Sequence, residues 1–185
     1  MTQNTKAKFP PELIITLNNP TKTAQKFLDW RNKPLRHYSG QFYEWTGTHY
    51  SVMNPNDIRA ELYHFLTEVT RTWITEVTKT PTGERQTTVN LEKPNPNSRH
   101  VEQILDALAG GPAHLASKIK APSWLPGANP EVVSKNRAEN MLALRNGLLN
   151  LVTGELLPHT SDFLTMNAGL RVRPGGHGTT LGSVP

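Results

Sequence analysis

The side chains best able to do chemistry are seven histidines and fifteen carboxylates, so the first question is whether their spacing lets them act together. The histidines stand at positions 37, 49, 64, 100, 114, 159 and 177, and no two have the i, i+4 spacing with which a helix presents histidines to zinc. The carboxylates are scattered along expected helix faces, whereas a catalytic magnesium site needs them clustered. We therefore predict no metal site and no bound cofactor.

His159 has a carboxylate on either side, Glu155 and Asp162, which is the composition of a general acid–base group. No nucleophile is fixed near them by spacing, and the chain has no cysteine. Turns also favour residues of these types. A solvated turn is therefore the preferred interpretation, with acid–base catalysis as the alternative, and we predict no catalytic residue.

Nucleotide hydrolysis needs a loop of the form G-x-x-x-x-G-K-[ST], in which backbone amides hold the phosphates and the lysine reaches the terminal one. No Gly-Lys pair occurs anywhere in the sequence. The nearest glycine-rich stretch, PGGHGTTLGSVP at residues 174–185, lacks the lysine, a strand before it and a helix after it. The sequence therefore predicts a protein that is not an enzyme by itself.

Composition sets the limits of the fold. Hydrophobic and charged residues are few, at 36% and 19% of 185 residues, while 15 prolines and 13 glycines favour loops. We expect a basic flexible arm at residues 1–20 with one short strand at 13–17, a folded domain at 21–168 and a disordered tail at 169–185. The lack of cysteine and of any apolar run of roughly 20 residues predicts a soluble, cytoplasmic protein without a membrane partner.

The net charge of +5 lies mainly at the front of the chain, where residues 1–36 hold seven lysines or arginines against two acids. Residues 37–97 have a net negative charge. Basic residues bind phosphates by releasing counterions, and exposed rings such as Tyr43 or Trp45 can stack on bases, although a merely solvated arm is the alternative. The candidate nucleic-acid-binding residues are Lys22, Lys26, Arg31, Lys33, Arg36, Arg71, Lys118, Lys120, Arg171 and Arg173.

The elements that must position these residues follow from the periodicity of the apolar side chains. A helix is expected over residues 21–33, capped by Thr21 or Thr23. Aromatic and polar residues alternate over residues 35–53, which predicts a hairpin or three-stranded meander with its tightest turn at Thr46-Gly47.

A long helix is indicated next, because apolar residues recur at helical spacing over residues 58–73, behind a cap at Asn56 or Asp57. Residues 78–97 are polar and contain prolines. They predict a long loop or linker with one short strand at TTVNL.

A third helix is expected from Ser98, its cap, to the glycine pair at residues 110–111. It is followed by a basic, proline-punctuated connector. Trp124 and Leu125 stand between two prolines of this connector, and we expect them to fill the core.

The last part of the chain predicts a short polar helix or turn at residues 130–138 and a closing hairpin. Residues 141–151 are expected to form one strand with a bulge or kink at Asn146-Gly147, and Thr153-Gly154 turns the chain back. Together the elements predict a small α+β domain of helices with two antiparallel β-hairpins, for which a winged-helix-like unit is one arrangement. The predicted core is Phe27, Phe42, Trp45, Leu62, Phe65, Leu66, Val69, Ile104, Leu105, Leu108, Trp124, Leu142, Leu144, Leu148, Leu149 and Leu156.

The block RNGLLNLVTGELLPHTSDF is the most specific pattern in the chain, and it follows GQFYEWTGTHY, IRAELYHFL, VEQILDAL and PSWL in order. From about residue 24 to about residue 168 this series resembles the domain that precedes the superfamily 3 helicase in phage and plasmid DNA primase-helicases, shared also with poxvirus-type ones. In that family the domain lies between a primase-like region and a hexameric helicase. The resemblance implies a role in the DNA replication of a virus, a plasmid or another mobile genetic element.

The chain departs from this family after Asn167, where a linker and the helicase would be expected. An engineered boundary, a natural truncation and a frameshifted tail would all give this appearance. The resemblance therefore implies a non-catalytic adaptor with modest DNA affinity, whose partners are helicase or primase subunits, DNA, or further copies of the chain. A dedicated DNA-binding domain and a stand-alone regulator of a replication machine remain the alternatives.

Overall fold

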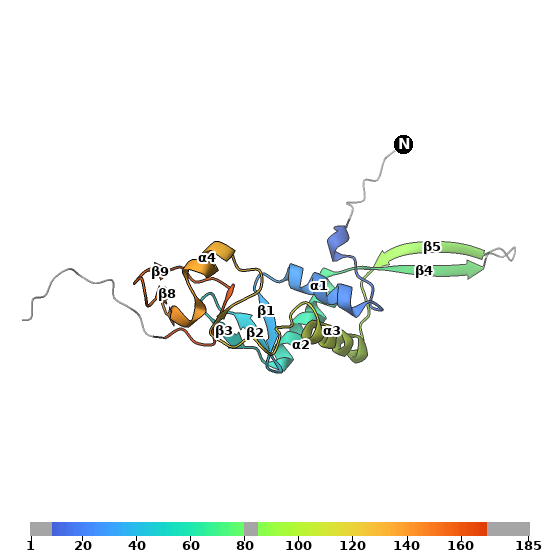
Figure 1. Cartoon of the computed structure of the whole chain (residues 1–185). Coiled ribbons are helices and arrows are strands. Elements are labelled where there is room, and N and C mark those ends of the chain that lie inside the picture. Colours follow the sequence, from blue (N-terminus) through green and yellow to red (C-terminus); the bar gives the residue numbers. More distant parts are fainter. Residues whose placement is uncertain (1–8, 80–84, 170–185) are drawn as a thin grey trace, which may run out of the picture. The chain divides into compact units, whose positions relative to one another are not determined.

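The computed structural model describes residues 9–79 and 85–169, and these form an α+β protein, which confirms the predicted fold class (Figure 1). The helices of this part are α1 (Pro20–Trp30), α2 (Pro55–His64), α3 (Ser98–Gly110) and α4 (Pro130–Lys135), with the single turns η1 (Pro11–Leu13), η2 (Phe65–Val69) and η3 (Ala138–Asn140). The strands are β1 (Leu35–Tyr38), β2 (Gln41–Trp45), β3 (Tyr50–Val52), β4 (Thr72–Lys79), β5 (Arg85–Glu92), β6 (Ser123–Trp124), β7 (Met141–Leu144), β8 (Gly147–Asn150), β9 (Leu156–Leu157) and β10 (Phe163–Leu164).

The described residues divide into two compact units. The first contains the chain up to Trp45 together with Ser51–Ile119, and the second contains Thr46–Tyr50 and the residues from Lys120 onward. Each unit has its own apolar core. In the first, α1, α2 and α3 bury Phe27, Leu62 and Ile104 completely, as the sequence predicts.

The core of the second unit forms between the β7–β8–β9 sheet and the β6–β10 pair. Leu148 and Phe163 are almost fully buried there, and the ring of Trp124 packs edge-on against Phe163. Tyr50 is also fully buried, and its hydroxyl donates to the carbonyl of Ser161 at 2.8 Å. Leu125 is buried as well, so both connector residues fill the core as predicted.

Three helices begin at an asparagine cap rather than at the predicted residues. The side chains of Asn19, Asn54 and Asn97 accept hydrogen bonds from backbone N–H groups in the first turns of α1, α2 and α3. In α1 and α2 a proline occupies the first helical position, where no N–H is needed. Because asparagine caps as well as serine or threonine does, the predicted caps are wrong by one to four residues.

The helix predicted over residues 58–73 is wrong in its second half. Regular α2 ends at His64, a single π-turn, η2, follows, and Trp73 lies in strand β4. The segment from Thr67 to Ile74 is rich in β-branched residues, which favour extended backbone over helix. The loop predicted over residues 78–97 is wrong in its extent. The short strand predicted at TTVNL is present within β5, but β5 is longer and pairs with β4 along eight residues.

The front of the chain contains no strand at residues 13–17 among the described elements. Ile14 forms one isolated bridge with Arg71 instead, next to the turn η1. The predicted meander is present as the sheet β1–β2–β3, but its tightest turn is Ser39-Gly40. Both residues have positive φ, of 49° and 80°, the conformation of a two-residue type I′ turn.

Residues 141–151 form two strands rather than one. Arg145 and Asn146 are the two-residue turn between β7 and β8, so the Asn-Gly signal marks a hairpin and not a bulge. This turn reverses the direction of the chain and changes which leucines face inward. Leu142 and Leu156, predicted to be core residues, are 44% and 43% exposed.

Candidate functional site

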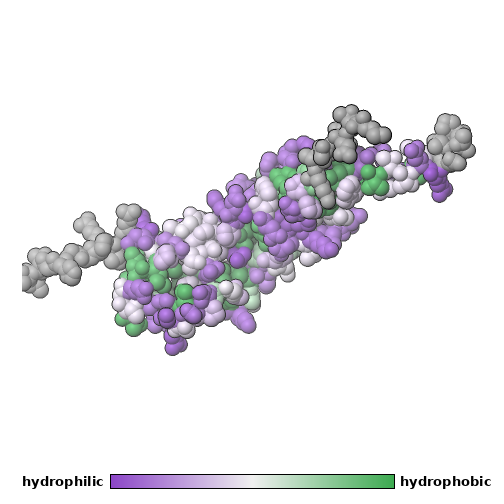
Figure 2. All heavy atoms as spheres, turned by 90° about the horizontal axis from the view of Figure 1, so that it is seen from above, coloured by the Kyte–Doolittle hydropathy of each residue, from purple (hydrophilic) through white to green (hydrophobic). Residues whose placement is uncertain are grey.

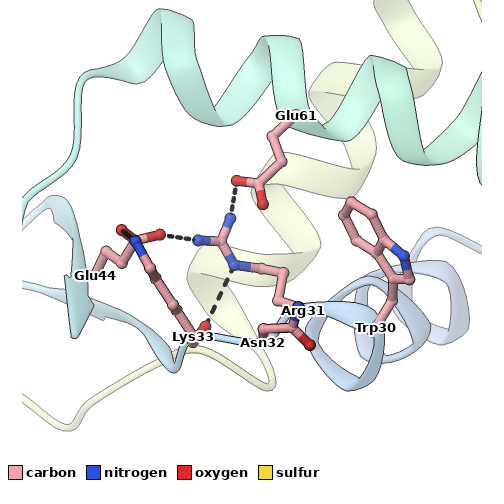
Figure 3. A pocket seen from close by; sticks show the side chains of 6 residues that line it. All are labelled: Trp30, Arg31, Asn32, Lys33, Glu44 and Glu61. Carbon is pink, nitrogen blue, oxygen red and sulfur yellow. Dashed lines mark hydrogen bonds and ion pairs between the residues drawn. The ribbon is translucent and has the colours of Figure 1, made fainter. Parts of the chain in front are cut away.

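Arg31 stands at the centre of the most charged cluster that the structure describes, at the end of α1 (Figure 3). Its guanidinium donates to the carboxylates of Glu44 on β2 and Glu61 on α2, and its Nε donates to the carbonyl of Lys33. Lys33 in turn donates to Glu44 at 3.1 Å. The Arg31 side chain is only 2% exposed, so its charge needs these partners.

A cavity of about 480 Å³ lies beside this cluster, with Trp30 and Asn32 completing its lining. Its two formal positive charges and two formal negative charges balance, and every charged group in it is already paired. Such a site has no net attraction for an anion or a cation. We therefore interpret the cluster as a structural clamp between α1, β2 and α2.

Three more of the predicted nucleic-acid-binding residues are held by the chain's own carbonyls. Lys26 donates to the carbonyls of Pro11 and Glu12, and Arg36 donates to that of Leu35. Arg71 donates to the carbonyl of Thr70 at 2.7 Å, and its guanidinium lies 5.2 Å from the ring centroid of Phe9. These cations are fixed by local structure, which reduces their freedom to follow a phosphate backbone.

The remaining predicted cations are exposed or lie outside the described residues. Lys22 is exposed in the first turn of α1, and Lys118 and Lys120 are exposed in the connector that follows α3. Arg171 and Arg173 lie outside the described residues. The structure therefore places the predicted cations on several separate elements rather than along one helix or strand.

The histidine and carboxylate motif of the closing segment shows no acid–base pairing. Both ring nitrogens of His159 are buried and lack a hydrogen-bond partner, so neither Glu155 nor Asp162 holds them. Within residues 9–79 and 85–169, no group of three or more His, Asp or Glu side chains could hold a metal ion. The glycine-rich stretch at residues 174–185 lies outside the described residues.

The β4–β5 hairpin (Figure 1) exposes an apolar surface in the first unit. Side chains alternate between the two faces of a strand, so the register Trp73–Leu91, Thr75–Val89 and Val77–Thr87 places these six residues on one face. We call them the hairpin face. Trp73, Val77 and Val89 are 57%, 59% and 55% exposed, and hydrophobic atoms are visible on the hairpin in Figure 2.

Basic residues flank the hairpin face at both ends. Arg85 begins β5 near the tip, Arg71 precedes β4, and Lys93 follows β5. Lys93 donates to the carboxylate of Glu68 at 2.7 Å, and this hydrogen bond and the ammonium charge lower the pKa of Glu68. The opposite face of the hairpin is polar apart from the half-buried Ile74, and it includes Glu76 and Glu92.

A second apolar surface lies in the second unit, on the outer face of the β7–β8–β9 sheet. Leu142, Leu149 and Leu156 are cross-strand neighbours there, and two of them are more than 40% exposed. Leu151 and Val152, in the turn after β8, are 60% and 73% exposed. The aromatic rings predicted to stack on bases are less available, since Tyr43 packs against Tyr38 and both Tyr43 and Trp45 are half-buried.

Sequence reasoning missed the hairpin face, because the helix and loop predictions separated Trp73 from Val89. A signal was nevertheless present. Residues 72–78 are rich in β-branched and aromatic residues before a Pro-Thr-Gly turn sequence, and Val89 and Leu91 alternate with Thr88 and Asn90 after it.

Comparison with known proteins provides no relative for this chain: no protein-family model matches it, and no curated protein matches it. Among the residues that the structure describes, no helix is both long and apolar enough to cross a bilayer.

Proposed function

We propose that this protein is a non-catalytic adaptor of a phage- or plasmid-type DNA replication machine, acting in the cytoplasm. It would bind a helicase or primase subunit and add modest DNA affinity. The replication setting rests on the resemblance of residues 24–168 to the domain that precedes a superfamily 3 helicase. The mode of action rests on one observation, the exposed apolar hairpin face.

An exposed apolar strand face supports protein binding better than DNA binding. Protein interfaces gather aromatic and aliphatic residues at their centre, and tryptophan is among the residues that contribute most to affinity. DNA interfaces are far more positively charged. Arg31, Lys33 and Lys26, which would contribute such charge, are paired within the first unit.

A dedicated DNA-binding domain remains the second candidate, because Lys22, Lys118 and Lys120 are exposed. A stand-alone regulator would use the same hairpin face as the adaptor. Binding assays with separate protein and DNA ligands therefore test the first distinction.

The test is to mix the purified chain with the separately purified helicase and primase subunits of the replicon that encodes it. We expect co-elution in size-exclusion chromatography, and we expect the double substitution Trp73→Ser and Val89→Ser to abolish it. Val52→Ser is the matched control, because Val52 is equally apolar and 53% exposed but lies in β3, outside both apolar surfaces.

Co-elution that survives the double substitution would contradict a role for the hairpin face. Tight, salt-sensitive DNA binding without any protein partner would favour the second candidate. Unaided ATP hydrolysis by the purified chain would contradict both.

A further inference from the structure

We infer that the hairpin face binds an acidic amphipathic helix of a partner protein. This inference rests on the proposed adaptor function and names the chemistry of the segment that the adaptor would take. It follows from the exposure of the face, the charges at its ends and its dimensions.

The hairpin face would be stabilised by burial against another element. An isolated two-stranded hairpin is at best marginally stable in water, and antiparallel sheets normally bury one face. In the two-stranded β4–β5 sheet, Trp73, Val77 and Val89 are more than half exposed, and Leu91 is half-buried. A partner that covered these side chains would be stabilised by roughly 25 cal/mol for each Å² of apolar surface buried.

The positive charges at the ends of the face favour a negatively charged partner. Arg85 lies in β5 at an odd-numbered position, as Val89 and Leu91 do, so strand alternation puts it on the same side of the hairpin. Arg71 and Lys93 lie just beyond the strand ends at the hairpin base. Lys93 is paired there with Glu68, whereas among the described residues the guanidinium of Arg71 donates only to backbone carbonyls and keeps an uncompensated positive charge. Glu76 and Glu92 are at even-numbered positions and belong to the other side. A ligand with carboxylates at both ends of an apolar stripe therefore complements this face.

The size of the face suits one helix. Eight residues per strand span about 27 Å at about 3.4 Å each, and two strands about 4.8 Å apart present a width close to the roughly 10 Å diameter of a helix. A helix rises 1.5 Å per residue, so about 18 residues would cover the face. Acidic residues in its first and last turns would then lie opposite Arg71 and Arg85.

A second copy of the chain fits less well. Two hairpin faces stacked tip to tip would bring Arg85 against Arg85, and stacked tip to base would bring Arg85 against Arg71, since Lys93 is already paired with Glu68, so both arrangements oppose like charges. The face also offers only a few hundred Å² per partner, well below the roughly 800 Å² of a standard stable interface. An area of this size suits a reversible contact with a helix.

A nucleic acid also fits less well. Single-strand platforms stack successive bases on several aromatic rings, and Trp73 is the one aromatic residue among the six of the hairpin face. Glu76 and Glu92 on the other face of the hairpin would repel phosphates. Binding of an oligonucleotide at Trp73 is therefore an outcome that the test must distinguish.

The test uses a fluorescein-labelled 18-residue helical peptide with leucines along one face and glutamates in its first and last turns. The control peptide replaces these glutamates with lysines. Fluorescence anisotropy with the full chain is expected to show micromolar binding of the acidic peptide and at least tenfold weaker binding of the lysine peptide. Arg85→Glu is expected to weaken the acidic peptide at least fivefold and to strengthen the lysine peptide.

Arg99→Glu is the matched control, since Arg99 is an exposed cation on α3 and not on β4 or β5, and this change should leave both peptides unaffected. Equal affinity for the two peptides, no binding of either peptide, or an oligo(dT) probe that displaces the acidic peptide would overturn the inference. These results would leave the adaptor function open to its own test, because co-elution with a replication subunit does not depend on the peptide. If the chain co-eluted with neither replication subunit but still bound the acidic peptide through Arg85, the adaptor function alone would be contradicted.

Discussion

Arg31 carries a positive charge where almost no water reaches it, and two glutamates compensate that charge. Replacing it with methionine would keep most of the side-chain volume but leave Glu61 without the cation that it faces and Glu44 with only the exposed Lys33. We expect Arg31→Met to lower the free energy of unfolding by about 3 kcal/mol, as breaking one side of a buried pair does. Urea denaturation followed by circular dichroism measures this change.

Lys33→Met is the matched control for Arg31, because Lys33 pairs with the same Glu44 but its side chain is 62% exposed. Exposed ion pairs contribute at most about 1 kcal/mol, so this variant should unfold within that range of the wild type. Equal losses for the two variants would show that burial of the guanidinium is not what matters.

Glu68 gives the hairpin base a defined response to pH. The hydrogen bond from Lys93 and its positive charge hold the pKa of Glu68 below its ordinary value. Because the folded pKa is lowered, the pair stabilises the fold at neutral pH, and this contribution disappears as the pH falls through the folded pKa. We expect the NMR titration midpoint of Glu68 to rise toward its ordinary value in Lys93→Gln; an unchanged midpoint would contradict the pairing.

At the scale of elements, the sequence predicted the helices and strands whose residue pattern alone determines them. The apolar spacing of α1 and α3 and the alternation in β1–β3 are sufficient signals, because each element buries one face of its own residues. Strand β5 could not be predicted in full, since its pairing with β4 across residues 80–84 fixes its length, and most of its side chains are exposed on both faces. The ion pairs of Arg31 with Glu44 and Glu61 could not be predicted from the sequence either, since the two glutamates lie on other elements.

The β7–β8 hairpin depends on Gly147. Its φ is 154°, and an added Cβ would lie 2.4 Å from the carbonyl oxygen of Leu157 and 2.9 Å from a methyl carbon of Leu156. Since the close backbone atom cannot move without disturbing β9, we expect Gly147→Ala to lower the free energy of unfolding by about 2–3 kcal/mol. Thermal unfolding followed by near-UV circular dichroism, which reports on Trp124 packing, measures it.

Gly154→Ala separates the clash from backbone strain. Gly154 has a φ of 73°, but nothing lies within 4 Å of an added Cβ there. This variant should therefore lose only the roughly 1 kcal/mol that a left-handed conformation costs an alanine. A larger loss at Gly154 than at Gly147 would contradict the close packing of β8 against β9.

At the scale of the whole molecule, each of the two units leaves an apolar surface exposed. The first unit exposes the hairpin face, and the second exposes the row of Leu142, Leu149 and Leu156. Contiguous exposed apolar surface is typical of protein interaction sites. Two such surfaces on one chain are what an adaptor between two subunits would require.

The predicted modest DNA affinity of the chain agrees with the internal pairing of several candidate cations among the described residues. In the first unit, Arg31 and Lys33 face glutamates, and Lys26 is held by backbone carbonyls. We therefore expect micromolar or weaker binding to a single-stranded oligonucleotide in fluorescence anisotropy at physiological salt. The slope of log affinity against log salt should be shallower than about −3, which corresponds to about four phosphates at roughly 0.7 per contact. A submicromolar affinity with a steeper slope would mean that a basic surface assembles on DNA, and the dedicated DNA-binding function would then be preferred.

The double substitution Lys118→Glu and Lys120→Glu should reduce this slope by the equivalent of at most about two phosphate contacts, since both lysines are exposed.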